Sequence, residues 1–519
     1  MAVDSRRIKS TLRRRQSSEI ASISILPTDP NLAAPDIEHL GPSTDGELSA
    51  LEAQHIADDF MEAAVPLNRR YSTLTMTLLW ITMLANFPMV IIGFEFYRTG
   101  FSLGQVVTGT IIGSLILVAF QFFSGLIGAR TGLNYSLLMK PVFGKLGVQF
   151  VCVIWSLMFL AWYALNAVLM TDGIKGLFGL SFWTPFLAVP LVAAMAINNW
   201  FGFRGVANFA RYLAAPVLIL WVCYAFGKTA SHIPLSLLFE SSRQPFSLCL
   251  VMIPVLVIGN TTWGNEADFF RYGKSSILRM AIPLAVSVVF GAILFPTTGW
   301  LLGHASGAAE TASFTKFMND YSFGHAPWLA TFALVVGYFA VNDGNLYGAI
   351  NALENIWKTT RHKVVVALVC LAGILAIALS FCPSALDLIA SLNSVVLPCI
   401  TMIIIFEYFM AGKFTSGNRN LQIFMDSKLA PLSDRTASRN ICWTAMIALT
   451  IGWIVGITTS GVLPQLKFLN VGVWILYAWF SSFAIYGIAR VIQIRRANQA
   501  GRLLSAVEYA YESEALNIS

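Results

Sequence analysis

Apolar runs of roughly 20 residues recur along this chain, and they constrain its fold more than any other feature. A helix of that length crosses the hydrocarbon core of a bilayer. Of the 519 residues, 56% are hydrophobic and only 12% are charged, about half the charged share of a soluble protein. The sequence therefore predicts an all-α integral membrane protein of about 12 transmembrane helices. We place them at 74–97, 104–128, 148–171, 182–200, 207–227, 246–266, 277–302, 327–352, 364–382, 386–410, 440–460 and 469–490.

The positive charges indicate an orientation for these spans. With both termini on one side, the loops of that side hold 28 of the 34 Lys and Arg residues, and the opposite loops hold six. Cytoplasmic loops are enriched in Lys and Arg, so both termini are expected in the cytoplasm of a plasma-membrane protein. The net charge of +7 then reflects topology and contact with membrane lipid, and no nucleic-acid partner is expected.

The spans also suggest how the chain is divided. We expect a disordered cytoplasmic tail at 1–65, a transporter core of ten helices at 66–410, a cytoplasmic loop at 411–439, two appended helices at 440–490 and a cytoplasmic tail at 491–519. The first segment is polar and cannot bury enough apolar surface to fold alone. The seven Cys residues lie mostly in apolar runs and show no disulfide or zinc spacing, so neither a metal nor an organic cofactor is expected.

Two spans carry residues that interrupt helices. The first span contains Asn86 and Pro88, and a proline frees the carbonyl four residues earlier. The sixth span contains Gly259 and Gly264 with several hydrogen-bonding side chains between them. Because these spans lie five helices apart, they cross the membrane in opposite directions, as in transporters built from inverted repeats. Ordinary kinks are the alternative, but their corresponding positions favour a solute site in a five-plus-five inverted repeat.

Polar side chains at membrane depth are candidate site residues. Trp162 and Asn166 share one helix face, where an indole plane and an amide suit a flat heteroaromatic solute, although a lone tryptophan is more often a packing residue. Asn342 and Asn345 are expected to line the cavity. Asp343 is either a substrate, cation or proton site, or a packing residue bonded to neighbouring backbone amides.

Four segments resemble the nucleobase–cation symporter-1 family, the cytosine and purine permeases. Residues 65–70 are similar to the segment that opens the family's first helix, and residues 125–133 match its loop after helix 2. Residues 267–273 (ADFFRYG) match its A-D-F-x-R-[FY]-G element, and residues 342–347 (NDGNLY) resemble its N-D-N-A-L-Y element. The resemblance runs to about residue 410 and implies the LeuT-like five-plus-five fold with two helices appended.

The resemblance also implies site roles. Trp162 falls on the tryptophan that stacks against the base, and Asn166 on a site asparagine. Residues implied to lie on the broken helices are Asn86 in the first, and Gly259, Thr261 and Thr262 in the unwound, substrate-binding part of the sixth.

Three positions depart from the family pattern. Phe159 replaces a glutamine found one turn before the tryptophan, and the segment 209–212 lacks the carboxylate of fungal members. Sodium-coupled members hold the ion with helix 1 carbonyls and two adjacent hydroxyls on helix 8, where this chain has Ala340 and Val341. A hard cation needs oxygen ligands, so the coupling ion is expected to be H⁺, with Asp343 as the candidate carrier.

The expected function is a symporter that imports a nucleobase, such as cytosine or a purine, or a related flat heterocycle. The alternative is a transporter of the same fold for a vitamin (pyridoxine or thiamine), allantoin or an amino acid. An enzyme is not expected because no His/Asp/Glu cluster lies within the spans, and a channel is not expected because no selectivity-filter segment is repeated. The small-molecule partner's identity and the oligomeric state stay open.

Overall fold

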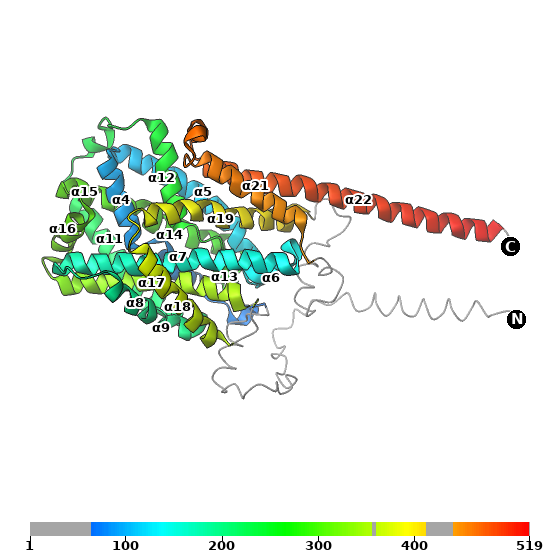
Figure 1. Cartoon of the computed structure of the whole chain (residues 1–519), viewed down its shortest axis with the longest axis horizontal. Coiled ribbons are helices and arrows are strands. Elements are labelled where there is room, and N and C mark those ends of the chain that lie inside the picture. The colour runs from blue at the N-terminus through cyan, green and yellow to red at the C-terminus, as the bar shows by residue number, and fades with distance from the viewer. Residues whose placement is uncertain (1–63, 355, 357–359, 412–439, 518–519) are drawn as a thin grey trace. The chain divides into compact units, whose positions relative to one another are not determined.

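The computed structural model describes residues 64–354, 356, 360–411 and 440–517, which form helices and no β-strand (Figure 1). The predicted tail at 1–65 and loop at 411–439 therefore lie almost entirely outside the described residues. The α-helices are α3 (Thr73–Leu84), α4 (Phe87–Thr99), α5 (Leu103–Thr131), α6 (Tyr135–Phe143), α7 (Lys145–Phe178), α8 (Pro185–Ala194), α9 (Ile197–Trp200), α10 (Gly202–Phe209), α11 (Ala215–Ala230), α12 (Phe246–Thr261), α13 (Glu266–Phe270), α14 (Ile277–Val288), α15 (Phe295–Ser306), α16 (Thr311–Phe323), α17 (Pro327–Glu354), α18 (Arg361–Leu379), α19 (Ala385–Phe409), α21 (Trp443–Thr459) and α22 (Ile475–Asn517).

Shorter helical turns connect or continue these helices. Three are 3₁₀ turns, at Leu67–Arg69, Leu235–Phe239 and Pro464–Leu469. Two are π-helical segments that join α-helices without a break: Ala210–Ala214 joins α10 to α11, and Val289–Leu294 joins α14 to α15. In the second of these, Gly291 lies against the backbone of Leu84 and Ala85, where the first span is interrupted.

The apolar helices coincide with the predicted spans, and the chain is a multi-pass membrane protein. Within the described residues, eight continuous helices are long and apolar enough to cross a bilayer, and α3 with α4, bent by 45°, makes a ninth if the pair is counted as one span. Three shorter apolar helices, at 185–200, 246–261 and 443–459, fall on the remaining predicted spans. The number of crossings stays a prediction. The last helix, α22, continues to Asn517, well beyond the predicted span end at residue 490.

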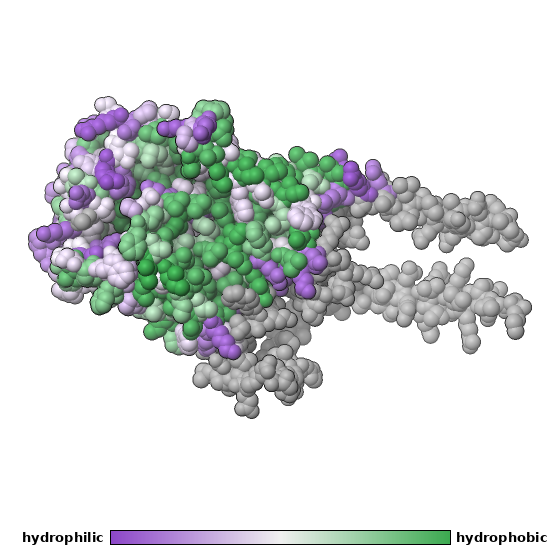
Figure 2. Space-filling model, viewed as in Figure 1, coloured by the Kyte–Doolittle hydropathy of each residue, from purple (hydrophilic) through white to green (hydrophobic). Residues whose placement is uncertain are grey.

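Hydrophobic side chains cover much of the outer surface of the helices. In Figure 2 they form a broad band, and hydrophilic residues gather toward the ends of that band. Large side chains in this outer surface include Phe186, which is 76% exposed, and Leu220, which is 71% exposed. Exposed apolar area on this scale is unfavourable in water and is the expected surface toward lipid.

The first span is broken where the sequence predicts. Helix α3 ends at Leu84 and α4 begins at Phe87, with Ala85 and Asn86 extended between them. Asn86 caps α4, because its Oδ1 accepts a hydrogen bond from the Met89 amide at 3.1 Å. Its Nδ2 donates to the Leu84 carbonyl at 3.3 Å, so the carbonyl of the last residue of α3 has a hydrogen-bond donor. Pro88 lies in the first turn of α4, where its missing amide donor costs nothing.

The break in the sixth span begins later than the sequence predicts. Helix α12 continues to Thr261, so Gly259 and Thr261 are helical, and the unwound segment comprises residues 262–265. Gly259 lies so close to the Ala390 backbone that a Cβ atom at this position would overlap the Ala390 carbonyl oxygen. The Thr261 hydroxyl donates to the Val257 carbonyl at 2.5 Å, one turn back in the same helix. The implied assignment of these two residues to unwound backbone is therefore wrong, and only Thr262 lies in the break.

The helices that flank both breaks are packed along much of their length. Helix α7 packs against α17, α4 against α15, and α12 against both α5 and α19. The appended helices α21 and α22 pack against each other and against α19. An ion pair reinforces this contact, since Arg490 of α22 lies 2.8 Å from the Glu407 carboxylate of α19.

Candidate functional site

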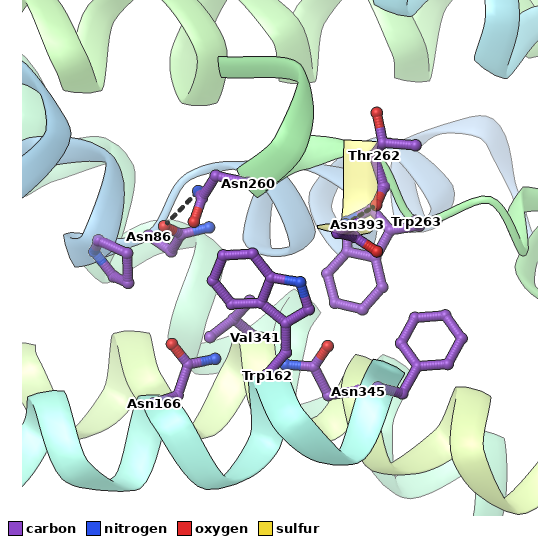
Figure 3. A pocket seen from close by; sticks show the side chains of 11 residues that line it. Asn86, Trp162, Asn166, Asn260, Thr262, Trp263, Val341, Asn345 and Asn393 are labelled. Atoms are coloured by element: carbon purple, nitrogen blue, oxygen red, sulfur yellow. Dashed lines mark hydrogen bonds between the residues drawn. The ribbon is translucent and has the colours of Figure 1, made fainter. Parts of the chain in front are cut away.

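The two helix breaks face α7, α17 and α19 around a small cavity (Figure 3). Its volume is about 10 Å³, room for about one water molecule. A ring-shaped solute can bind only after the lining residues move apart. These residues are Asn86, Pro88, Phe159, Trp162, Asn166, Asn260, Thr262, Trp263, Val341, Asn345 and Asn393.

Five of the predicted site residues line this cavity: Asn86 and Thr262 from the two breaks, Trp162 and Asn166 from α7, and Asn345 from α17. In Figure 3 the Trp162 indole lies in the middle of the group, with Asn86 and Asn260 on one side and Asn166 and Asn345 on the other. The structure thus brings together residues that lie as much as 259 positions apart in the sequence.

Asn342 does not line the cavity, but its side chain accepts hydrogen bonds from two residues that do. The Asn342 Nδ2 donates to the Tyr163 carbonyl at 2.9 Å. Its Oδ1 accepts from Asn166 Nδ2 at 2.9 Å and from Asn345 Nδ2 at 3.1 Å. Asn342 therefore positions lining side chains and is not itself part of the cavity wall.

Asp343 faces away from the cavity, toward α9. Its Oδ2 accepts from Asn198 Nδ2 at 2.8 Å, and its backbone carbonyl accepts from Asn199 Nδ2 at 3.0 Å. The carboxylate is fully buried, and its Oδ1 has no hydrogen-bond partner among the described residues. The packing alternative predicted bonds to backbone amides, but the donor found here is a side-chain amide.

A second tryptophan in the cavity wall was not predicted from the sequence. Trp263 follows Thr262 in the unwound segment, and its ring stacks on Phe159 with centroids 6.0 Å apart and planes at 25°. The departure at Phe159 thus exchanges an amide for an aromatic contact. The sequence did carry a signal for Trp263, because an aromatic residue inside a predicted helix break is expected to face the space that the break encloses.

Two further asparagines complete the wall. Asn260 Nδ2 donates to Asn86 Oδ1 at 3.2 Å, which joins the two broken spans directly. Asn393 of α19 donates from Nδ2 to the carbonyls of Gly259 and Thr262, both at 2.8 Å. These bonds give donors to backbone carbonyls at the C-terminal end of α12. Each of these asparagines is an amide inside an apolar span, which was the available sequence signal.

The residues that line the cavity carry no formal charge. The nearest carboxylate along the unwound segment, Glu266, is buried and accepts from the Gly264 amide at 3.1 Å and from the Ser124 hydroxyl at 2.5 Å. It stabilises the break and does not belong to the lining. The arrangement therefore suits a neutral, flat and polar-edged solute better than an ion.

A larger cavity of about 530 Å³ lies one helical turn away, toward α16. Leu169 and Tyr338 line it, and they lie one turn from Asn166 and Val341 of the small cavity. Phe87, which directly follows Asn86, also lines the larger cavity and packs against Tyr338 with ring centroids 6.3 Å apart. These two aromatic rings belong to the wall of the larger cavity and are not part of the lining of the smaller one.

The positions at which the family resemblance implies sodium-binding hydroxyls are apolar in their packing as well as in their chemistry. Ala340 lies in a small apolar cluster with Ala214 and Val336. Val341 lines the small cavity. Gly337, one turn earlier, lies against the Phe87 ring at the start of α4.

Comparison with known proteins shows which family the chain matches. Residues 65–484 match the family described as permease for cytosine/purines, uracil, thiamine, allantoin. The purine-uracil permease NCS1 of Arabidopsis thaliana is 22% identical over 301 residues. The matched part spans about half of each chain, 49% of this one and 49% of the relative.

Solved structures share the fold. Mhp1, a nucleobase-cation-symport-1 family transporter in a closed conformation with bromovinylhydantoin bound, matches with a TM-score of 0.65 and 15% identity over 84% of this chain and 96% of that one. Its inward-facing conformation matches with a TM-score of 0.65 and 16% identity over 84% and 93%. A Na⁺-coupled sialic acid symporter matches with a TM-score of 0.53 and 13% identity over 85% and 96%.

The fold neighbours have the LeuT-like five-plus-five architecture that the sequence predicted. Both the neighbours and the matched family are transporters, in agreement with the prediction that this chain is not an enzyme. The family match covers the predicted core, the first appended helix and the beginning of the second. The chain therefore belongs to the nucleobase–cation symporter-1 family of cytosine and purine permeases.

Proposed function

We propose that this chain is a secondary active symporter of the plasma membrane that imports a nucleobase or a related flat heterocycle. The observation that carries the proposal is the neutral cavity at the junction of two broken helices, with Trp162 and Trp263 in its wall. Indole planes bind flat rings by stacking, and side-chain amides bind their polar edges. The curated relative is named as a purine-uracil permease, and the Mhp1 structure holds a substituted hydantoin.

The mechanism follows from the two cavities. With both termini cytoplasmic, as the Lys and Arg distribution favours, the larger cavity near α16 opens toward the outside. Solute enters there, passes Phe87 and Tyr338, and stacks on Trp162 as the small cavity widens. Rocking of one helix group against the other then exposes the solute to the cytoplasm, as in alternating access.

The proposed coupling ion is H⁺. Ala340 and Val341 offer no side-chain oxygen to a sodium ion near the first break. The Asp343 carboxylate is buried, and among the described residues it accepts one hydrogen bond, from the neutral amide of Asn198. An ionised carboxylate in such surroundings is strongly disfavoured, so Asp343 is suited to carry a proton. Asp343 adjoins Asn342, which holds two lining amides, so a change at its carboxyl is well placed to alter the cavity.

The test uses the full-length protein reconstituted in liposomes. Uptake of labelled cytosine, hypoxanthine and pyridoxine is measured at two external pH values, with sodium or choline, and with an unlabelled panel that includes uracil, allantoin, thiamine and amino acids. We expect saturable uptake of a heterocycle that increases with an inward proton gradient and is unchanged when choline replaces sodium. Uptake of an amino acid alone, or of no compound, would overturn the proposed substrate class. Collapse of uptake in choline would overturn proton coupling.

A further inference from the structure

The orientation of one cavity amide is fixed by backbone groups. Asn393 approaches two carbonyl oxygens, those of Gly259 and Thr262, each at 2.8 Å. A carbonyl only accepts, so the NH₂ group of Asn393 must face both of them. Its Oδ1 is therefore turned the other way, and it is buried with no hydrogen-bond partner among the described residues.

A second backbone carbonyl fixes the orientation of the Asn342 amide and, through it, the orientations of two lining amides. The Tyr163 carbonyl requires the NH₂ group of Asn342, which leaves Asn342 Oδ1 as an acceptor. Asn166 and Asn345 must then both donate their NH₂ groups to that oxygen. In Figure 3 the oxygens of Asn166 and Asn345 point to the side on which the Trp162 ring lies. Asn166 Oδ1 is also buried without a partner in the described part of the chain.

The amides around the cavity therefore present oxygen atoms to a solute. Asn166, Asn345 and Asn393 each offer an amide oxygen as an acceptor. Both N–H groups of Asn393 are used by the two backbone carbonyls, whereas Asn166 and Asn345 each keep one N–H. The two indole N–H groups and the Thr262 hydroxyl, which also accepts, have no partner in the described residues. Asn393 differs from the other lining amides described above in that it can only accept, because both of its N–H groups are occupied. A buried acceptor that meets another acceptor loses its hydrogen bonds to water and gains none.

We propose that this site prefers rings that carry an exocyclic amino group over their oxo analogues, and that Asn393 is a residue that determines this preference. The inference rests on the proposed function and specifies its substrate class as aminopyrimidines or aminopurines. An exocyclic NH₂ brings two donors to the Asn393 oxygen and the neighbouring amide oxygens. The oxo analogue brings an acceptor to the same place, and sites built from buried polar groups reject such mismatches strongly.

The first test compares matched pairs of rings in proteoliposomes that contain the full chain. Unlabelled cytosine is compared with uracil, and adenine with hypoxanthine, as competitors of whichever labelled ring is taken up. We expect the amino member of the better-bound pair to compete roughly tenfold or more strongly, the effect of one buried hydrogen bond made against one lost. Equal or better competition by the oxo members would overturn this inference and leave the transporter proposal standing. No uptake of any ring would instead count against the proposed function.

The second test asks whether Asn393 sets the ratio. In Asn393→Leu the acceptor is lost, and the amino-to-oxo competition ratio is expected to fall roughly tenfold, toward one. Asn470→Leu is the matched control, because Asn470 Nδ2 also donates to a backbone carbonyl, that of Thr459 at 3.1 Å, but lies outside the cavity lining. Its ratio should equal that of the parent.

A further variant keeps the test decisive if Asn393→Leu does not fold, since Asn393 also satisfies the end of α12. Asn166→Leu removes another unpartnered acceptor and leaves the bonds from Asn393 intact. Its competition ratio should fall in the same direction. A folded Asn393→Leu that keeps the parent ratio overturns the role of Asn393. If Asn393→Leu does not fold, an unchanged ratio in Asn166→Leu overturns the inference.

Discussion

Gly93 of α4 lies directly against the backbone of Pro296 in α15, so that a Cβ atom at position 93 would overlap the Pro296 carbonyl group. The reciprocal contact is made by Gly299 of α15, which lies against the Val90 backbone in α4. Small residues that let two helices approach to backbone contact are the usual basis of tight packing in membranes. The position of the second half of the first span therefore depends on two glycines.

Gly93→Ala should destabilise the protein by about 1–3 kcal/mol, because the added methyl group forces α4 away from α15. The measurement is the midpoint of thermal unfolding in detergent. Gly227→Ala is the matched control, since Gly227 is also helical but has no heavy atom within 4 Å of its Cβ position. A midpoint for Gly93→Ala as high as that of the control would show that the interface is looser than described.

Trp162→Ala should weaken substrate binding by about 1–3 kcal/mol, or roughly 5- to 150-fold, because the ring loses its stacking surface. Trp162→Phe keeps a flat ring and should retain part of the affinity. Both variants are measured by uptake kinetics alongside the amount of protein at the cell surface. Normal kinetics in Trp162→Ala, at normal surface expression, would remove Trp162 from the substrate site.

Trp263→Ala should lower uptake as well, for a different reason. Trp263 lines the cavity and also stacks on Phe159, so its loss removes a cavity wall and an aromatic contact between α7 and the unwound segment. We expect both weaker binding and a lower unfolding midpoint. An unaltered midpoint in Trp263→Ala would argue against the Phe159 contact.

Asp343→Asn should abolish accumulation of substrate against its gradient while downhill exchange persists. The amide keeps the shape and can still bond Asn198, but it cannot take up and release a proton. Uptake by this variant should no longer respond to external pH. Asp320→Asn, which alters a carboxylate of α16 that pairs with His325, serves as the control. Retained uphill accumulation in Asp343→Asn would eliminate Asp343 as the proton carrier.

Glu407→Ala should destabilise the contact between α19 and α22. The Glu407 carboxylate accepts from Arg490 at 2.8 Å and from the Tyr486 hydroxyl at 2.9 Å, and it is nearly buried while Arg490 is 29% exposed. Removing one partner of a buried pair costs about 3–5 kcal/mol, and the partial exposure of Arg490 reduces this to roughly 1–3 kcal/mol. A double-mutant cycle of Glu407→Gln and Arg490→Gln, followed by thermal unfolding, would measure the coupling; a coupling near zero contradicts the assignment.

Features that depend on local chemistry could be predicted from the sequence. The break at Asn86 and Pro88 follows from a capping side chain beside a residue without an amide donor, and both act within one helical turn. The apolar spans were predictable for the same reason, because lipid acts on each helix separately.

Features that depend on packing between distant helices could not be predicted. Gly259 permits an unwound backbone, but it is helical and lies against the Ala390 backbone, and the break begins at Thr262. The polarity of Asn342 was informative, yet its direction is set by the Tyr163 carbonyl, 179 residues away. Asn393 was missed because its role exists only once α19 lies against the end of α12.

On the proposed route, solute passes from a chamber of about 530 Å³, which Phe87 and Tyr338 line, to a compartment of about 10 Å³. Exclusion by bulk and discrimination by hydrogen bonding would then take place at separate points along that route. A compound with a flat head and a wide tail can reach the outer chamber without being carried through. Blockers of this protein consequently need not resemble its cargo in size, and the chamber is where their affinity can be increased without copying the transported ring.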